Sequence, residues 1–144
     1  MSRPSRVEST VVTTTVRLLS PFVLTFALFT LFHGTSSVGG GFQGGVVAAV
    51  VVSFAFAFGV QETAAWLSPR TLLALVAAGP LVFGVVSMAG LVFGGAFMQF
   101  DVLPIPKPSV YATEAIELGI GATVGAVVSV LFVRLAADPA GGER

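Results

Sequence analysis

Two glutamates at the start of an apolar stretch are the residues of this sequence best suited to chemistry. Glu114 and Glu117 are three residues apart, and the segment from Glu117 to Arg134 is otherwise almost entirely apolar. In a helix, residues three apart share a side, so both carboxylates would face one way, with Glu114 nearer water. An ionisable group inside a membrane is costly and by default indicates a function. We expect Glu117 to hold a cation or a proton; the alternative is an interfacial acid favoured by the helix dipole.

Two further titratable residues could pass a proton or a cation to or from these glutamates. His33 ends the first apolar run, and it is either a hydrogen-bonding group at a helix end or a proton relay, because histidine titrates near neutral pH. Asp101 lies in a proline-rich segment with Lys107, and these two residues are either paired with each other or solvated. The candidates for ion translocation are therefore Glu117, Glu114, His33 and Asp101.

Several classes of function are disfavoured. The chain has no cysteine and one histidine, so it offers no thiol nucleophile and no zinc site, and we expect no metal, no cofactor and no enzyme activity. The net charge of zero argues against nucleic acid as a partner. Gly39, Gly41 and Gly44 fit the spacing of a dinucleotide-binding loop, but that pattern has meaning only within a βαβ unit, which this sequence does not predict.

The elements that must position these residues are membrane helices. The 144 residues are 55% hydrophobic and 10% charged, whereas soluble domains carry about 25% charged residues. The apolar runs predict an all-α integral membrane protein, a bundle of four transmembrane helices with short loops, in one membrane domain over residues 1–144. We expect the helices at about 11–32, 44–62, 71–97 and 111–134. Pro80 should bend the third helix or break its hydrogen-bond ladder.

Small residues recur at helical spacing in three of these segments, and such faces favour close packing between membrane helices. The second helix has Gly45, Ala49 and Ser53 on one side, and the fourth has Gly121, Gly125 and Ser129 on the side that carries Glu117. The third has Ser87, Gly90 and Gly94, of which the two glycines form a GxxxG pair.

The basic residues predict the orientation. With four spans, both termini and the connection between the second and third helices lie on one side, and that side holds six arginines: Arg3, Arg6, Arg17, Arg70, Arg134 and Arg144. The other side holds Lys107. Because basic residues favour the cytoplasm, we expect both termini to be cytoplasmic.

A glycine-rich stretch after the first helix is the most distinctive string in the sequence. It runs from His33 to Gly45, with His33-Gly34 followed by Gly39-Gly40-Gly41-Phe42-Gln43-Gly44-Gly45. We interpret it as a tight connection between two helices, pressed against its neighbours. This stretch resembles the signature of the MnhB/MrpB family, the B subunit of multisubunit (Mrp-type) Na+/H+ antiporters. The family usually has proline where this chain has Val38, and its Glu-x-Gly-Val-Gly pattern is matched here by Glu117 to Gly121.

The resemblance implies a subunit of a monovalent cation/proton antiporter complex in the cell membrane, in the region where sodium movement is proposed, with Na+ and H+ as the transported ions. Its partners would be the other antiporter subunits and the lipid bilayer. The residues themselves indicate a small membrane subunit of a larger assembly, since so few polar groups can hardly build a carrier alone. Two alternatives remain open: a purely structural membrane subunit of that complex or of a related, hydrogenase-like complex, and a small homo-oligomeric exporter.

Overall fold

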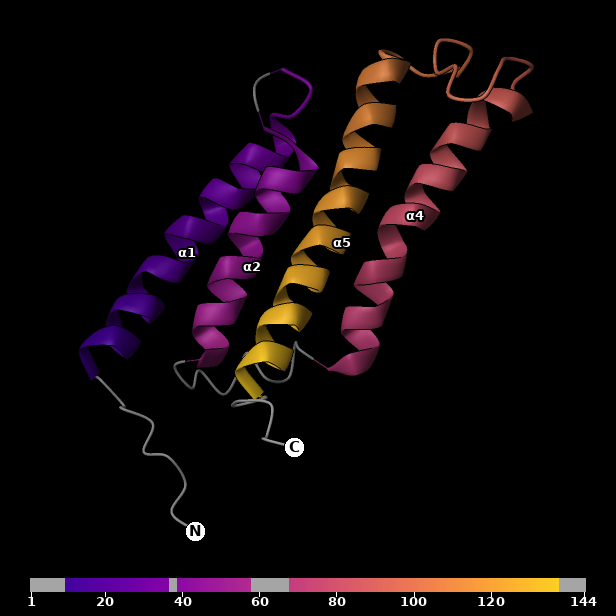
Figure 1. The fold of residues 1–144 in the computed structure, drawn as a ribbon. Coiled ribbons are helices and arrows are strands. Elements are labelled where there is room, and N and C mark those ends of the chain that lie inside the picture. The colour runs from indigo at the N-terminus through magenta and orange to yellow at the C-terminus, as the bar shows by residue number, and fades with distance from the viewer. Residues whose placement is uncertain (1–9, 37–38, 58–67, 138–144) are drawn as a thin grey trace, which may run out of the picture.

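The computed structural model describes residues 10–36, 39–57 and 68–137, and its regular elements are four helices (Figure 1). With the labels of that figure, they are α1 (Thr10–Phe32), α2 (Gly41–Ala57), α4 (Pro69–Val92) and α5 (Pro108–Ala137). Three of them, α1, α4 and α5, are long and apolar enough to cross a membrane, and α2 is a shorter apolar helix of 17 residues. The predicted all-α membrane fold is confirmed.

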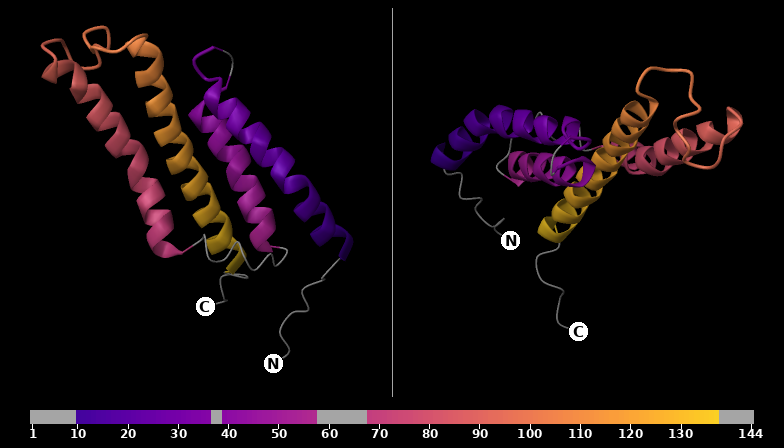
Figure 2. Two further views of the ribbon diagram at one scale, coloured as in Figure 1. Left: turned by 180° about the vertical axis from the view of Figure 1, so that it is seen from behind. Right: turned by 90° about the horizontal axis from the view of Figure 1, so that it is seen from above.

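The four helices lie side by side in the order α1, α2, α5, α4, as the two views of Figure 2 show. The central helix α5 packs against α2 on one side and α4 on the other, and α1 packs mainly against α2. The α1–α2 and α4–α5 connections both lie at one end of the row, here called the loop end. Because the row is open, most large apolar side chains remain exposed, such as Leu28, Leu81 and Leu135.

Helix α2 begins at Gly41, three residues before the expected start at residue 44. Gly40 has a φ of +119°, a backbone conformation that residues with a Cβ rarely adopt, and this lets the chain reverse tightly. The Gly40 N–H donates to the Thr30 carbonyl of α1 (3.1 Å), and the Gly44 N–H donates to the Gly40 carbonyl (3.0 Å). The triple glycine therefore joins the end of α1 to the first turn of α2. The expected end of this helix, near residue 62, lies outside the described residues.

Helix α4 is bounded by a serine and a glycine. At its start the Ser68 side chain accepts a hydrogen bond from the Thr71 N–H, and Pro69 occupies the first turn. At its end Gly94 has a φ of +83°, so the helix stops at Val92 and not near residue 97. The predicted GxxxG pair is therefore wrong, because Gly94 lies outside the helix. Gly90 is buried instead against the backbone of Ala96 and Gln99 in the returning loop.

Helix α5 starts at Pro108, three residues before the expected residue 111, because proline is compatible with the first turn of a helix. The preceding Lys107 has a φ of 51° and turns the chain into the helix. Helix α5 runs on to Ala137, beyond the expected residue 134, and its 30 residues make it the longest of the described helices. It is therefore long enough to contact both α2 and α4 along their lengths.

Candidate functional site

The Glu117 carboxylate lies beneath the glycine-rich connection between α1 and α2. A Cβ built on Gly40 would be 3.0 Å from Oε2 and 3.1 Å from Oε1, and a Cβ built on Gly34 would overlap the carboxylate. The Gly41 backbone packs against the Glu117 backbone carbonyl, so the first turn of α2 rests directly on α5. The carboxylate thus occupies space that exists because these positions have no side chain.

The environment of this carboxylate is unusual for an acid. Its Oε2 atom is buried from solvent and has no hydrogen-bond partner in the described structure. Buried polar atoms in proteins are nearly always hydrogen-bonded, and an exception requires an explanation, such as an ion, a water or a functional role. The N-terminus of α2 begins beside the carboxylate, and the partial positive charge of a helix N-terminus favours a negative group there.

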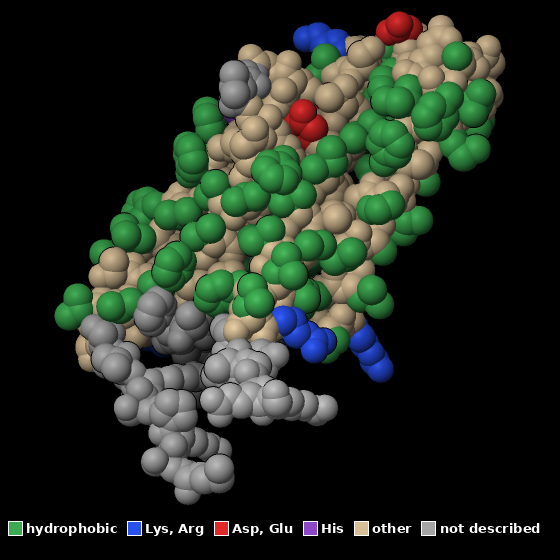
Figure 3. Space-filling view, viewed as in Figure 1, with side chains coloured by type: hydrophobic (Ala, Val, Ile, Leu, Met, Phe, Trp, Pro, Cys, Tyr) green, Lys and Arg blue, Asp and Glu red, His purple; other side chains and the backbone are tan. Residues whose placement is uncertain are grey.

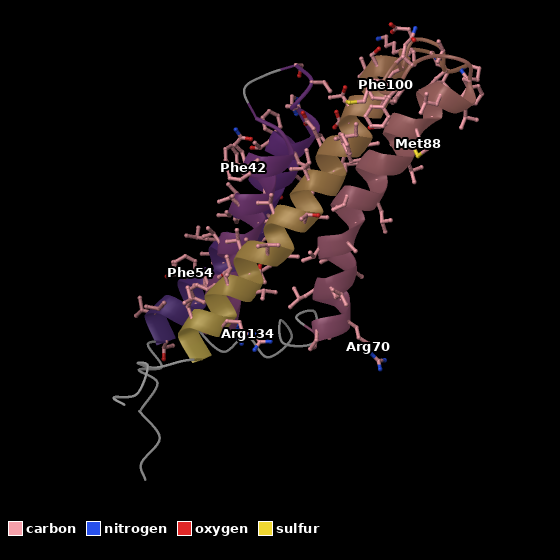
Figure 4. The ribbon with its side chains drawn as sticks, turned by 45° about the vertical axis from the view of Figure 1, so that its right-hand side comes forward. Phe42, Phe54, Arg70, Met88, Phe100 and Arg134 are labelled. Atoms are coloured by element: carbon pink, nitrogen blue, oxygen red, sulfur yellow. The ribbon has the colours of Figure 1, made fainter. Side chains whose placement is uncertain are left out.

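Glu114 is one turn from Glu117 toward the loop end, and it is half-buried. Within the described ranges neither acid forms an ion pair with a basic side chain. Arg70 and Arg134 lie at the end of the molecule opposite the loop end (Figure 4), and Arg17 lies about four turns before the end of α1. Figure 3 shows an acidic side chain within a largely apolar face, whereas the basic side chains gather at the two ends.

The other titratable candidates, His33 and Asp101, each contact a residue other than Glu117. The His33 ring follows α1 and stacks on Phe29, with ring centroids 4.0 Å apart, and its Nδ1 lies 2.8 Å from the Phe29 carbonyl oxygen. Asp101 is exposed in the α4–α5 connection and accepts a hydrogen bond from the Ser109 hydroxyl (3.0 Å). Lys107 is exposed as well and makes no ion pair with Asp101. The structure therefore places Glu117 and Glu114 near each other and leaves Asp101 in the loop.

The predicted small-residue faces of α2 and α5 meet below Glu117. A Cβ on Gly45 would be 2.7 Å from the Gly121 carbonyl oxygen and 3.0 Å from the Val124 Cβ. A Cβ on Gly125 would be 3.3 Å from the Gly45 carbonyl oxygen. Ser53 and Ser129 are buried further along the two helices. The helices can approach this closely because both present glycine at the crossing, and this contact fixes the depth of Glu117 relative to the α1–α2 connection.

The remaining residues of the glycine-rich string divide into two groups. Gly39 packs against Thr30, and Gly44 packs against the α1 backbone at Ala27 and Leu31. Phe42 and Gln43 are exposed on the first turn of α2, and the Gln43 side chain makes no hydrogen bond to any described residue. The string therefore combines glycines that hold α2 against α1 and α5 with two side chains that point away from these contacts.

Sequence reasoning missed Thr123, which lies between α5 and α4. Pro80 has no N–H, so the Val76 carbonyl of α4 loses its helical donor. The Thr123 hydroxyl donates to that carbonyl (3.0 Å) and accepts a hydrogen bond from the Gly79 N–H (3.1 Å). Gly79 and Gly119 pack closely at the same point. A threonine facing a proline of a neighbouring helix is visible only once the helix pairing is known.

The described residues contain no group of three or more His, Cys, Asp or Glu side chains that could hold a metal ion. Glu117 supplies one carboxylate, and main-chain atoms of the glycine-rich connection surround it. Chemically, this arrangement can hold a proton or a monovalent cation on one carboxylate.

Comparison with known proteins gives consistent matches. Residues 11–130 match a family model described as a domain related to the MnhB subunit of Na+/H+ antiporter. Curated relatives from Staphylococcus aureus strains Newman and COL, both named "Putative antiporter subunit mnhB2", are each 35% identical over 134 residues. These alignments cover 87% of this chain and 94% of each relative.

Proposed function

The chain belongs to the MnhB family of Na+/H+ antiporter subunits, and we propose that it is a small subunit of a multisubunit complex that exchanges Na+ for H+ across the cell membrane. The open row of helices supports this proposal, because it leaves apolar side chains exposed along α1, α4 and α5 that other subunits and lipid can cover. The partners are the other subunits of the antiporter, and the role is transport and not enzymatic catalysis.

We further propose that Glu117 contributes directly to ion translocation. The observation that carries this proposal is the buried Oε2 atom, which has no partner in the described structure. Hard cations prefer oxygen ligands, so a carboxylate here can bind Na+. Protonation removes the charge that holds the cation, so Na+ and H+ compete for the same group. The glycine backbone beside the carboxylate supplies no cationic side chain that would compete with an ion.

Replacing the carboxylate by an amide tests this role. Glu117→Gln keeps the size of the side chain but cannot ionise, and we expect the complex to assemble and Na+-driven proton exchange to fall. Interactions with a charged group are worth about 1.5–3 kcal/mol, so the loss should be on the order of tenfold or more. The measurement is ΔpH dissipation by added Na+ in inverted vesicles, with the subunit content determined on the same vesicles.

Glu114→Gln is the matched control, because it removes a carboxylate one turn nearer the loop end and should have a milder effect. Glu117→Asp should retain part of the activity, since the charge remains. Full activity of an assembled Glu117→Gln complex would remove this residue from the ion path.

A purely structural role is the second candidate. The dense glycine contacts between α2 and α5 favour it, because they show that this region is built for close packing. A tagged chain that co-purifies with several different subunits supports either role within the antiporter, whereas recovery of this chain alone would indicate a homo-oligomeric exporter. Recovery with hydrogenase subunits would place it in a hydrogenase-like complex.

A further inference from the structure

We propose that a groove along the α2–α5 contact receives a membrane helix of another subunit, and that this helix places a lysine or arginine beside Glu114. The inference rests on the proposed membership of an antiporter complex, and it adds the docking surface and the chemistry of the partner.

The groove has a floor of small residues and walls of larger ones. Its floor comes from α2 and α5 and consists of Gly44, Gly45, Ala48, Gly121, Ala122 and Gly125. Toward the loop end, α1 forms one wall with Leu24, Leu28 and Leu31. Toward the opposite end, α4 forms the other wall with Thr71, Leu72 and Leu75. Ala48, Gly121 and Ala122 line both halves, so the two halves form one continuous groove.

This shape fits a helix. Small residues let a second helix backbone approach closely, which is how membrane helices gain packing energy in lipid. The walls are not covered by the chain itself: Leu28 is 53% exposed and Leu75 is 39% exposed. Since α1 and α4 stand at opposite ends of the row, neither can close over the groove.

Charge complementarity identifies the occupant. Along α5, Glu114 precedes Leu118 by four residues and Gly121 by seven, so it continues the groove-facing line of the helix toward the loop end. Glu114 is half-buried, and the described part of the chain supplies no basic side chain to pair with it. A carboxylate among membrane helices is costly unless it is paired. A lysine or arginine near the loop end of the docked helix supplies that pairing.

A second copy of this chain is a poor occupant. A copy in the same membrane orientation would have Arg17, Arg70 and Arg134 far from Glu114, toward the end of the molecule opposite the loop end. Of the basic side chains that the structure describes, Lys107 alone reaches the loop end, and it belongs to the connection before α5 and not to a spanning helix. The matching charge therefore comes from a different polypeptide.

Photocross-linking of the purified complex tests the position of the partner. Because the chain has no cysteine, single cysteines can carry a benzophenone maleimide. Leu118→Cys reports on the groove, and Ile120→Cys is the matched control, at nearly the same depth and exposed fraction (38% and 39%) but about 200° round the helix. We expect Leu118→Cys to cross-link to a spanning helix of another antiporter subunit that carries a lysine or arginine at the level of Glu114.

A charge exchange tests the pairing. We expect Glu114→Lys to reduce recovery of the cross-linked subunit at least severalfold, and Glu114→Gln to reduce it less. When Glu114→Lys is combined with a glutamate in place of the partner's basic residue, we expect recovery to be restored. Cross-linking of Leu118→Cys to lipid or to a second copy, or a partner helix with no basic residue at that level, would overturn the inference. Na+-driven proton exchange is measured in the same preparation, so that the docking of a partner helix is tested separately from the role of Glu117 in ion exchange. If docking is absent while exchange still depends on Glu117, the inference alone fails.

Discussion

At Glu117, the position of the carboxylate depends on the absence of side-chain atoms on two neighbouring segments. Gly34 and Gly40 approach it from the α1–α2 connection, and Gly41 contacts its backbone from α2. These contacts differ in kind. A Cβ at Gly34 would meet the flexible end of the glutamate, whereas a Cβ at Gly41 would meet backbone and the Ile120 Cβ. Substitution at Gly34 should therefore move the carboxylate, and substitution at Gly41 should separate the helices.

Gly34→Ala provides a test that keeps the charge of Glu117. We expect the complex to assemble and Na+-driven proton exchange to fall, because the new methyl group displaces the carboxylate from its place under the connection. Adding Glu117→Asp should partly restore exchange, since aspartate withdraws the carboxylate by one methylene. Initial rates of Na+-driven ΔpH collapse in inverted vesicles give the comparison. If the double variant is no better than Gly34→Ala alone, displacement of the carboxylate is not the cause.

The sequence singles out Glu117 as a candidate, because a carboxylate in an apolar helix stands out in any sequence. The contact with Gly34 could not be predicted in the same way, because Gly34 and Glu117 are far apart in the chain and meet only through the pairing of α2 with α5. For Gly90 and Gly94, the sequence predicts a contact that the structure does not contain. Their spacing suggests a helix-packing pair, but Gly94 ends the helix with a positive φ.

At the level of the helices, the α4–α5 contact is organised around a proline. Pro80 lies inside α4, and the helix continues through it from Pro69 to Val92. The Thr123 hydroxyl of α5 satisfies the carbonyl that Pro80 leaves without a donor, and it also binds the Gly79 N–H. The expected disturbance of the ladder is thus repaired from the neighbouring helix, which ties α4 and α5 together at this depth.

Thr123→Val should weaken this contact, because it keeps the shape of the side chain and leaves a carbonyl and an N–H without their partner. We expect a loss of about 1 kcal/mol, as for other hydrogen bonds between membrane helices. Thr123→Ser should be close to the parent. Thr25→Val is the control, since the Thr25 hydroxyl bonds the Pro21 carbonyl within its own helix. The measurement is the thermal unfolding midpoint of the detergent-solubilised complex. Equal shifts for Thr123→Val and Thr25→Val would argue against a bond between helices.

For the whole molecule, the arrangement of the helices in a row explains why so little of the chain is buried. The sequence predicts the four helices that the structure describes and most of their length, because hydropathy and proline positions carry that information. It does not predict the order α1, α2, α5, α4, which depends on glycine contacts between segments far apart in the chain. Both apolar faces of the row remain exposed, as expected for a subunit that packs among others.

The orientation of the row in the membrane is a further prediction. The excess of arginine at the end opposite the loops favours a cytoplasmic location for that end. Ser36→Cys should therefore react with a membrane-impermeant maleimide added to intact cells, and Ser68→Cys should react only in inverted vesicles. The cysteine-free parent gives the background. Labelling of Ser68→Cys from outside the cell would contradict the predicted orientation.

The central claim is that Na+ and H+ compete for the Glu117 carboxylate, and carbodiimide labelling measures this competition at the residue itself. A hydrophobic carbodiimide reacts with a protonated carboxyl group in an apolar environment and adds a mass that can be located by peptide sequencing. In the assembled complex, we predict that Glu117 is modified and that Na+, but not choline, at equal ionic strength slows the modification. Labelling of Glu117 at the same rate with and without Na+ would contradict the account.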